Sequence, residues 1–166
     1  ADALTEGSAT MSIRQLRRRF VDAQVSLVLL RVIVGFGFIA HGYAKLERGP
    51  EHFADVLAAI GVPAPGFTAW LTTLVELVGG AALVVGAFVV PVCCVLAIVM
   101  LTAMFAVHLP YGFSSVKLVE ITPVGARFGP VGYEINLLYV AALVVFATVG
   151  ASPLSLDRWR SSRRSV

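Results

Sequence analysis

Four long apolar stretches, each carrying one or two ionisable residues, constrain this chain more than any other feature of its sequence. They cover residues 25–43, 67–87, 92–109 and 133–150. A helix rises 1.5 Å per residue, so about 20 apolar residues cross the hydrocarbon core of a bilayer. The pattern predicts an all-α membrane protein, folded as a bundle of four transmembrane helices.

The composition agrees with a membrane protein. Hydrophobic residues make up 58% of the chain and charged residues 14%, and the mean hydropathy is +0.86. Soluble domains are on average about 45–50% apolar and about 25% charged. With 166 residues, the chain has room for one modest membrane domain and short flanking segments.

Two arginine clusters flank the apolar stretches. Because such clusters mark the cytoplasmic ends of transmembrane helices, both termini are predicted to be cytoplasmic, and nucleic acid is not expected as a partner. We divide the chain into a disordered, basic N-terminal segment (1–23), a membrane domain (24–152) and a basic C-terminal tail (153–166). The arginines are Arg14, Arg17, Arg18, Arg19, Arg158, Arg160, Arg163 and Arg164.

The connections between the apolar stretches differ in length. Between the first two, residues 47–65 place Phe53, Val56, Leu57 and Ile60 at helical spacing, which predicts a short amphipathic helix at the membrane interface. The second and third stretches are joined by a short turn. Residues 110–130 form a longer loop, rich in glycine and proline, before the fourth stretch.

Six ionisable residues within or beside the apolar stretches are the candidate functional residues. A charge inside a bilayer costs at least about 2.5–3.5 kcal/mol, so it usually faces the bundle interior and has a partner. Arg31 and Glu76 lie at compatible depths, which predicts a buried ion pair between them. His41 and Lys45 share one helix face because they are four residues apart. The six residues are Arg31, His41, Lys45, Glu76, His108 and Glu134.

Several interpretations of these residues remain open. Imidazole and carboxylate groups from His41, His108, Glu76 and Glu134 suit a transition metal, but Lys45 lies one turn from His41 and would repel a cation, so we predict no metal. A hydrogen-bonded polar core is the plainest alternative. In that case Lys45 and Arg31 neutralise the two glutamates.

Quinone binding is the third interpretation. A quinone needs an apolar slot and hydrogen-bond donors at its carbonyls, and histidine can relay protons near neutral pH. His41, His108, Glu134 and Glu76 are therefore candidate ligand or proton-relay residues, with Arg31 and Lys45 as charge partners. Aromatic residues that could line the slot are Phe36, Phe38, Tyr43, Phe105 and Phe113.

The chain resembles the DoxX family of small bacterial and archaeal membrane proteins. The motifs HG-x-x-K, E-L-x-G-G and G-x-E, together with a terminal SLD, occur in order along four apolar stretches. They lie in LRVIVGFGFIAHGYAKL (30–46), ELVGGAALVVG (76–86), YGF (111–113), GYEINLLYV (132–140) and GASPLSLDRW (150–159). The resemblance implies a multi-pass protein of a bacterial or archaeal cytoplasmic membrane.

The family takes its name from a subunit of a thiosulfate:quinone oxidoreductase, and its members are described as membrane partners in thiol-redox assemblies. The resemblance therefore implies a redox-linked subunit that binds a quinone or supports a quinone-reactive partner. An accessory or scaffold subunit of a larger respiratory or photosynthetic complex is the alternative. A small-molecule or ion transporter is a weaker one. Membrane lipid and other membrane protein subunits are the expected partners.

Overall fold

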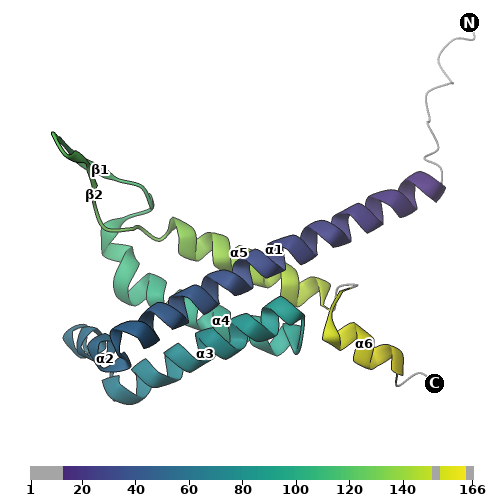
Figure 1. The fold of residues 1–166 in the computed structure, drawn as a ribbon, viewed down its shortest axis with the longest axis horizontal. Coiled ribbons are helices and arrows are strands. Elements are labelled where there is room, and N and C mark those ends of the chain that lie inside the picture. The colour runs from purple at the N-terminus through teal and green to yellow at the C-terminus, as the bar shows by residue number, and fades with distance from the viewer. Residues whose placement is uncertain (1–12, 151–153, 164–166) are drawn as a thin grey trace, which may run out of the picture.

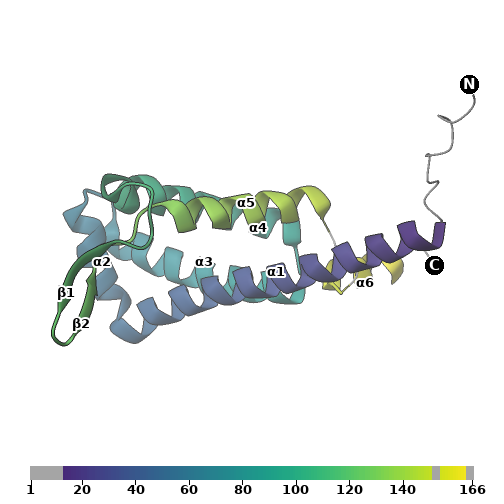
Figure 2. The ribbon, with the colours of Figure 1, turned by 90° about the horizontal axis from the view of Figure 1, so that it is seen from above.

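The computed structural model describes residues 13–150 and 154–163, with side chains from Gln24 onward. The long helices form two layers, as Figure 2 shows: α1 and α3 lie in one layer and α4 and α5 in the other. Their bounds are α1 Ile13–Arg48, α3 Pro65–Val85, α4 Val89–Ala103 and α5 Glu134–Val149. This arrangement confirms the prediction of a membrane protein built from apolar helices.

Three helical segments are long and apolar enough to cross a membrane within the described part of the chain. They are Gln24–Arg48, Pro65–Val85 and Val89–Tyr111. The third segment continues from α4 through a π-helical turn, η1 (Met104–His108), and a 3-10 turn, η2 (Leu109–Tyr111). The fourth apolar helix, α5, has 16 residues, which is shorter than the roughly 17–25 residues of a typical span.

The N-terminal segment differs from the prediction. We expected residues 1–23 to be disordered, but α1 begins at Ile13 and continues without a break into the first apolar stretch. Figure 1 shows its N-terminal part extending beyond the rest of the bundle. Residues 1–12 lie outside the described part of the chain, so the prediction is wrong for residues 13–23.

The short amphipathic helix predicted between the first two apolar stretches is present as α2, Pro50–Ala59. Leu57 is buried and Phe53 half-buried, whereas Glu51 and Asp55 are exposed. Gly61 follows the helix with a φ of 78°, a left-handed conformation that glycine adopts without steric cost.

The long loop contains a β-hairpin that sequence analysis missed. Strands β1 (Leu118–Thr122) and β2 (Gly125–Phe128) pair antiparallel. Their residues are mostly exposed, so the two-stranded ribbon adds little to the core. We call the end of the bundle that carries this ribbon and α2 the hairpin end.

The opposite end carries α6, Leu156–Arg163, which falls in the predicted basic tail. In Figure 1, α6 lies beside the turn between α3 and α4, on the same side of the bundle as the start of α1. We call this the arginine end. The two ends hold most of the charged groups considered below.

The core between the two ends is apolar. Each of the four long helices contributes a fully buried side chain: Phe38, Leu83, Leu96 and Leu143. The Phe38 ring meets the Tyr139 ring edge to face, with centroids 5.3 Å apart. This packing joins the layer of α1 and α3 to the layer of α4 and α5.

Glycines allow α1 and α3 to approach closely. A Cβ atom added to Gly35 would lie 2.8 Å from the Gly80 carbonyl oxygen, and one added to Gly80 would lie 2.7 Å from the Gly35 oxygen. Small residues at such crossings are typical of membrane helix pairs, whose association depends on close packing rather than on the hydrophobic effect. Gly35 and Gly80 therefore serve as packing residues at this crossing.

Candidate functional site

Glu76 and Lys45 form an ion pair at the hairpin end. Both carboxylate oxygens of Glu76 lie 2.5 Å from the Lys45 Nζ atom. Glu76 is buried in α3, with 3% of its side chain exposed, and Lys45 of α1 is 21% exposed. The same ammonium group lies 4.8 Å from the centre of the Phe53 ring in α2. This pair therefore ties α1, α2 and α3 together.

Arg31 is buried at the other end of the bundle. Its Nη2 atom donates to the Leu154 carbonyl oxygen at 2.7 Å and to the Val84 oxygen at 3.5 Å. Val84 follows Glu76 by eight residues in α3, which corresponds to about 12 Å along a helix. The predicted Arg31–Glu76 ion pair is therefore wrong, because Glu76 pairs with Lys45 and Arg31 binds the α3 C-terminus and the segment before α6.

Asp157 organises the arginine end. Its two carboxylate oxygens accept the backbone N–H groups of Phe88 and Val89, each at 2.9 Å. These donors lie at the start of α4, where N–H groups have no partner within the helix. The Asp157 N–H in turn donates to the Gly86 oxygen at 3.1 Å, and its carboxylate interacts electrostatically with Arg31.

The position of Gly86 shows how tightly this end is packed. It ends α3 with a φ of 71°, and a Cβ atom there would lie 2.5 Å from the Ser155 Cβ and 2.7 Å from the Arg31 Nη1. Asp157 and Ser155 lie in the SLD motif, to which sequence analysis assigned no role. The sequence did contain one signal for this role. No Ser, Thr, Asp or Asn stands at the start of α4, which indicates that a residue from elsewhere in the chain caps this helix.

Glu134 and His108 hold the loop at the hairpin end. The Glu134 Oε2 atom accepts a hydrogen bond from the Ser115 N–H at 3.0 Å. The backbone N–H of Glu134 donates to the Phe113 carbonyl oxygen. The His108 Nδ1 atom lies 3.1 Å from the Val131 carbonyl oxygen, to which the Nδ1–H tautomer would donate. Both side chains thus bind the backbone of the segment between η2 and α5.

Asn136 is a buried polar residue that sequence analysis overlooked. Its Nδ2 atom donates to the Met100 carbonyl oxygen at 3.3 Å. Met100 lies four residues before the π-helical turn η1, and its carbonyl oxygen also accepts the backbone N–H of Met104. The Asn136 side chain of α5 therefore adds a second hydrogen bond to this carbonyl, which links α5 to α4 next to the irregular turn.

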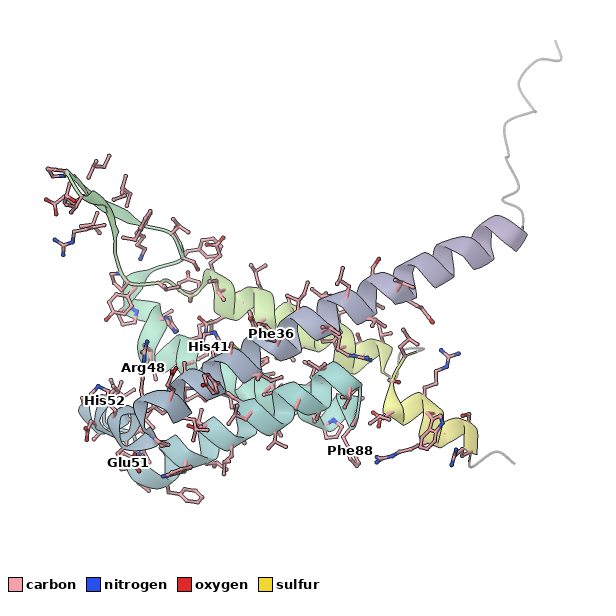
Figure 3. All side chains as sticks on the ribbon, in the orientation of Figure 1. Phe36, His41, Arg48, Glu51, His52 and Phe88 are labelled. Atoms are coloured by element: carbon pink, nitrogen blue, oxygen red, sulfur yellow. The ribbon has the colours of Figure 1, made fainter. Side chains whose placement is uncertain are left out.

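His41 differs from the other candidates. It is exposed on α1, and Figure 3 shows it on the half of the helix nearer the hairpin end. Among the side chains that the structure describes, none makes a hydrogen bond or ion pair with its imidazole. His41 is therefore available to a lipid, a ligand or another protein.

The predicted ligand residues thus have separate partners instead of a shared site. Glu76 binds Lys45, Glu134 binds the Ser115 backbone, and His108 binds the Val131 backbone. Within the described residues, no group of three or more His, Cys, Asp or Glu side chains is placed to hold a metal ion.

The aromatic residues proposed to line a quinone slot are also dispersed. Phe38 is buried against Tyr139, whereas the others are more than half exposed. Phe113 packs edge to face on Tyr133 in the loop. The exposed set is Phe36, Tyr43, Phe105 and Phe113.

An apolar cavity lies elsewhere, between α3 and α4. Its volume is about 550 Å³ and its lining is apolar. Such a lining suits a hydrocarbon chain and provides no hydrogen-bond donor for a quinone carbonyl. The cavity is lined in part by Leu74, Val78, Ala82, Phe88, Val92 and Val95.

Comparison with known proteins agrees with the resemblance seen in the sequence. A curated relative from Haemophilus influenzae, itself an uncharacterized protein, is 29% identical over 133 residues, covering 79% of this chain and 87% of the relative. No solved structure matches the chain. The family model described as DoxX matches residues 26–109, which include Arg31, His41, Lys45, Glu76 and His108 and make up just over half of the sequence. The chain therefore belongs to the DoxX family of membrane proteins.

Proposed function

We propose that this chain is a non-catalytic accessory subunit of a larger membrane complex, in which its charged residues fix the arrangement of its own helices. One observation carries the proposal: five of the six predicted site residues bind other elements or backbone groups of the same chain. Chemistry on a shared ligand requires groups that converge on one position. The sixth residue, His41, is exposed.

Mass spectrometry of the natively purified protein tests this proposal. The chain would be extracted in mild detergent, and both proteins and lipid-soluble cofactors that accompany it would be identified. An accessory subunit is expected with a stoichiometric set of other membrane proteins that hold the cofactors. A monodisperse chain that carries its own quinone, without partner subunits, would overturn the proposal.

We further propose four membrane spans, with both termini cytoplasmic in a bacterial or archaeal membrane. The apolar helix α5 lies alongside α4 in Figure 2, which supports counting it as a short span. An even number of spans also agrees with the start of α1 and the helix α6 lying at one end of the bundle in Figure 1. Shorter spans can be accommodated by local thinning of the bilayer.

Cysteine labelling tests this topology. In a background that lacks Cys93 and Cys94, a cysteine would replace Val124, which is 98% exposed at the hairpin tip, or Arg163 in α6. A membrane-impermeant maleimide should label Val124→Cys in intact cells and Arg163→Cys only after permeabilisation. The reverse pattern, or labelling of both from outside, would contradict the proposed orientation.

A redox-linked subunit that contacts a quinone is the second candidate, and the exposed imidazole of His41 favours it. A neutral imidazole can donate a hydrogen bond to a quinone carbonyl and can exchange a proton near neutral pH. The residue lies in α1 and faces outward, so the apolar wall of the site would have to come from lipid or a partner subunit.

Matched histidine substitutions separate this candidate from the accessory role. His41→Ala should reduce quinone-dependent turnover of the native complex, whereas His52→Ala, at another exposed histidine on α2, should leave it unchanged. Equal turnover for the two variants, with both complexes fully assembled, would remove the quinone candidate and leave the accessory role.

A further inference from the structure

We propose that the apolar groove between α3 and α4 binds an acyl chain of an anionic phospholipid, whose phosphate is held by Arg160 of α6. The groove has a volume of about 550 Å³, and its lining includes Leu74, Val78 and Ala82 from α3. An apolar groove alone does not identify its occupant. The positive charge of Arg160 at one end of the groove indicates an occupant with a negatively charged headgroup.

Phe88 lies at the arginine end of the groove and forms part of its wall. The Arg160 guanidinium lies over the Phe88 ring, with its Cζ atom 5.2 Å from the ring centre. Figure 3 labels Phe88 at the turn between α3 and α4, on the side where α6 lies. A positive group is therefore held at the point where the apolar wall ends.

The position of Arg160 is fixed by the contacts of α6. Asp157 accepts hydrogen bonds from the N–H groups of Phe88 and Val89, which holds the first turn of α6 on the α3–α4 turn. Arg160 follows Asp157 by three residues, and residues at this spacing lie on the same side of a helix. The carboxylate of Asp157 is already engaged in these contacts, so the arginine charge is left to attract an anion.

A phospholipid combines the two features that this arrangement requires. Its hydrocarbon chain suits the apolar groove, and its phosphate suits a planar guanidinium group. Basic residues beside a membrane helix attract anionic headgroups, and an additional negative charge on the headgroup strengthens the attraction. Phosphatidylglycerol is therefore expected to bind in preference to zwitterionic phosphatidylcholine.

Native mass spectrometry of the full chain in detergent tests the site, with phosphatidylglycerol or phosphatidylcholine added at equal concentration. The unmodified chain should retain phosphatidylglycerol at least about fivefold more than phosphatidylcholine, because each basic group near the headgroup contributes about this factor. Equal retention of the two lipids would overturn the proposal, since the groove would then bind acyl chains without regard to charge.

Two pairs of variants locate the binding. Arg160→Gln should lower phosphatidylglycerol retention about fivefold, whereas Arg158→Gln, on nearly the opposite side of α6 at 3.6 residues per turn, should leave it unchanged. Ala82→Phe fills the groove and should also lower retention, whereas Ala81→Phe, on an exposed position of α3 outside the lining, should not. Arg160 is exposed, so its variant should fold even if Ala82→Phe does not.

The remaining outcomes would contradict the proposed occupant. Equal losses from Arg160→Gln and Arg158→Gln would indicate diffuse attraction to a basic helix instead of a defined site. A dimer of the chain that disappears in Ala82→Phe would assign the groove to a second copy. Either result would overturn the lipid site without affecting the accessory role proposed above.

Discussion

The hairpin end and the arginine end of the bundle hold their buried charges by different means. At the hairpin end, the Glu76 carboxylate meets one ammonium group from the adjacent helix, Lys45. At the arginine end, Arg31 donates to the backbone carbonyls of Val84 and Leu154 and lies beside Asp157, which caps α4. The first arrangement is a pair of side chains, and the second is a network through the backbone.

This difference determines which side chains at each end can be replaced without loss of stability. A buried ion pair can be replaced as a whole by apolar residues of similar volume, often without loss of stability, but removing one partner leaves an uncompensated charge. A backbone network has no equivalent replacement, because the Phe88, Val89 and Leu154 backbone groups remain whichever side chain is changed. Substitutions at the two ends should therefore lower the free energy of unfolding by different amounts. They should also differ in whether a second substitution restores stability.

The largest effect is expected at the hairpin end. Glu76→Ala should lower the free energy of unfolding by about 3 kcal/mol, the low end of the range for breaking a buried ion pair, because Lys45 is partly exposed and can reach water. Reversible unfolding in mixed micelles, followed by circular dichroism, measures this. Glu47→Ala, at an exposed position of α1, is the control. An equal effect of the two variants would show that the Lys45–Glu76 pair contributes nothing.

A smaller effect is expected at the arginine end. Asp157→Ala removes the acceptor for two N–H groups of α4, and loss of a helix cap costs up to about 2 kcal/mol. Hydrogen exchange should show the amides of Phe88 and Val89 losing protection, while amides in the middle of α4 stay protected. Asp55→Ala in α2, where the side chain is exposed, should change neither. Unchanged protection in Asp157→Ala would refute the capping role.

The irregular turn at the hairpin end should show a lesser effect. Asn136→Ala deletes the donor to the Met100 carbonyl, and one such hydrogen bond contributes about 1 kcal/mol to stability. The unfolding free energy in mixed micelles measures the loss. Thr148→Ala in the same helix, where the exposed hydroxyl binds carbonyls of its own helix, should have little effect. A loss from Thr148→Ala as large as that from Asn136→Ala would contradict the role assigned to Asn136.

The smallest effect is expected at the exposed ion pair of the hairpin. Arg127 and Glu120 are 73% and 55% exposed, with 3.3 Å between Nη1 and Oε2. Exposed pairs contribute at most about 1 kcal/mol, so Glu120→Gln should shift the unfolding free energy by less than about 0.5 kcal/mol. A loss comparable to that of Glu76→Ala would show that the hairpin, and not the helix pair, stabilises this end.

The helices and the candidate site were predictable to different extents. Apolar length and helical spacing predicted the long helices and α2, because both patterns follow from local sequence. The partners of Arg31 were not predictable, because they include the Leu154 carbonyl. Every residue has a backbone carbonyl, so the sequence does not indicate which one accepts a hydrogen bond. The cost of a charge in a bilayer correctly predicted that Glu76 is buried, but the comparison of depths paired it with Arg31 instead of Lys45.

The hairpin and the capping role of Asp157 were missed for related reasons. The two strands have only five and four residues, and Pro123 and Gly125 lie at the turn between them, which resembles an ordinary loop. Their pairing depends on contacts across that turn. Asp157 caps a helix that begins 68 residues earlier in the chain, whereas sequence rules for caps consider only adjacent residues. Sequence spacing therefore does not predict contacts between a side chain and a backbone group that is distant along the chain.

The most direct test of the account is the paired substitution Lys45→Met with Glu76→Met. If the two residues only fix α1 against α3, this double variant should unfold within about 1 kcal/mol of the unmodified chain, because apolar residues of similar volume replace the pair. It should also co-purify with the same membrane proteins in the same proportions. A double variant that folds with normal stability but loses its partner subunits, or the quinone-dependent turnover of its complex, would contradict the structural role assigned to the pair.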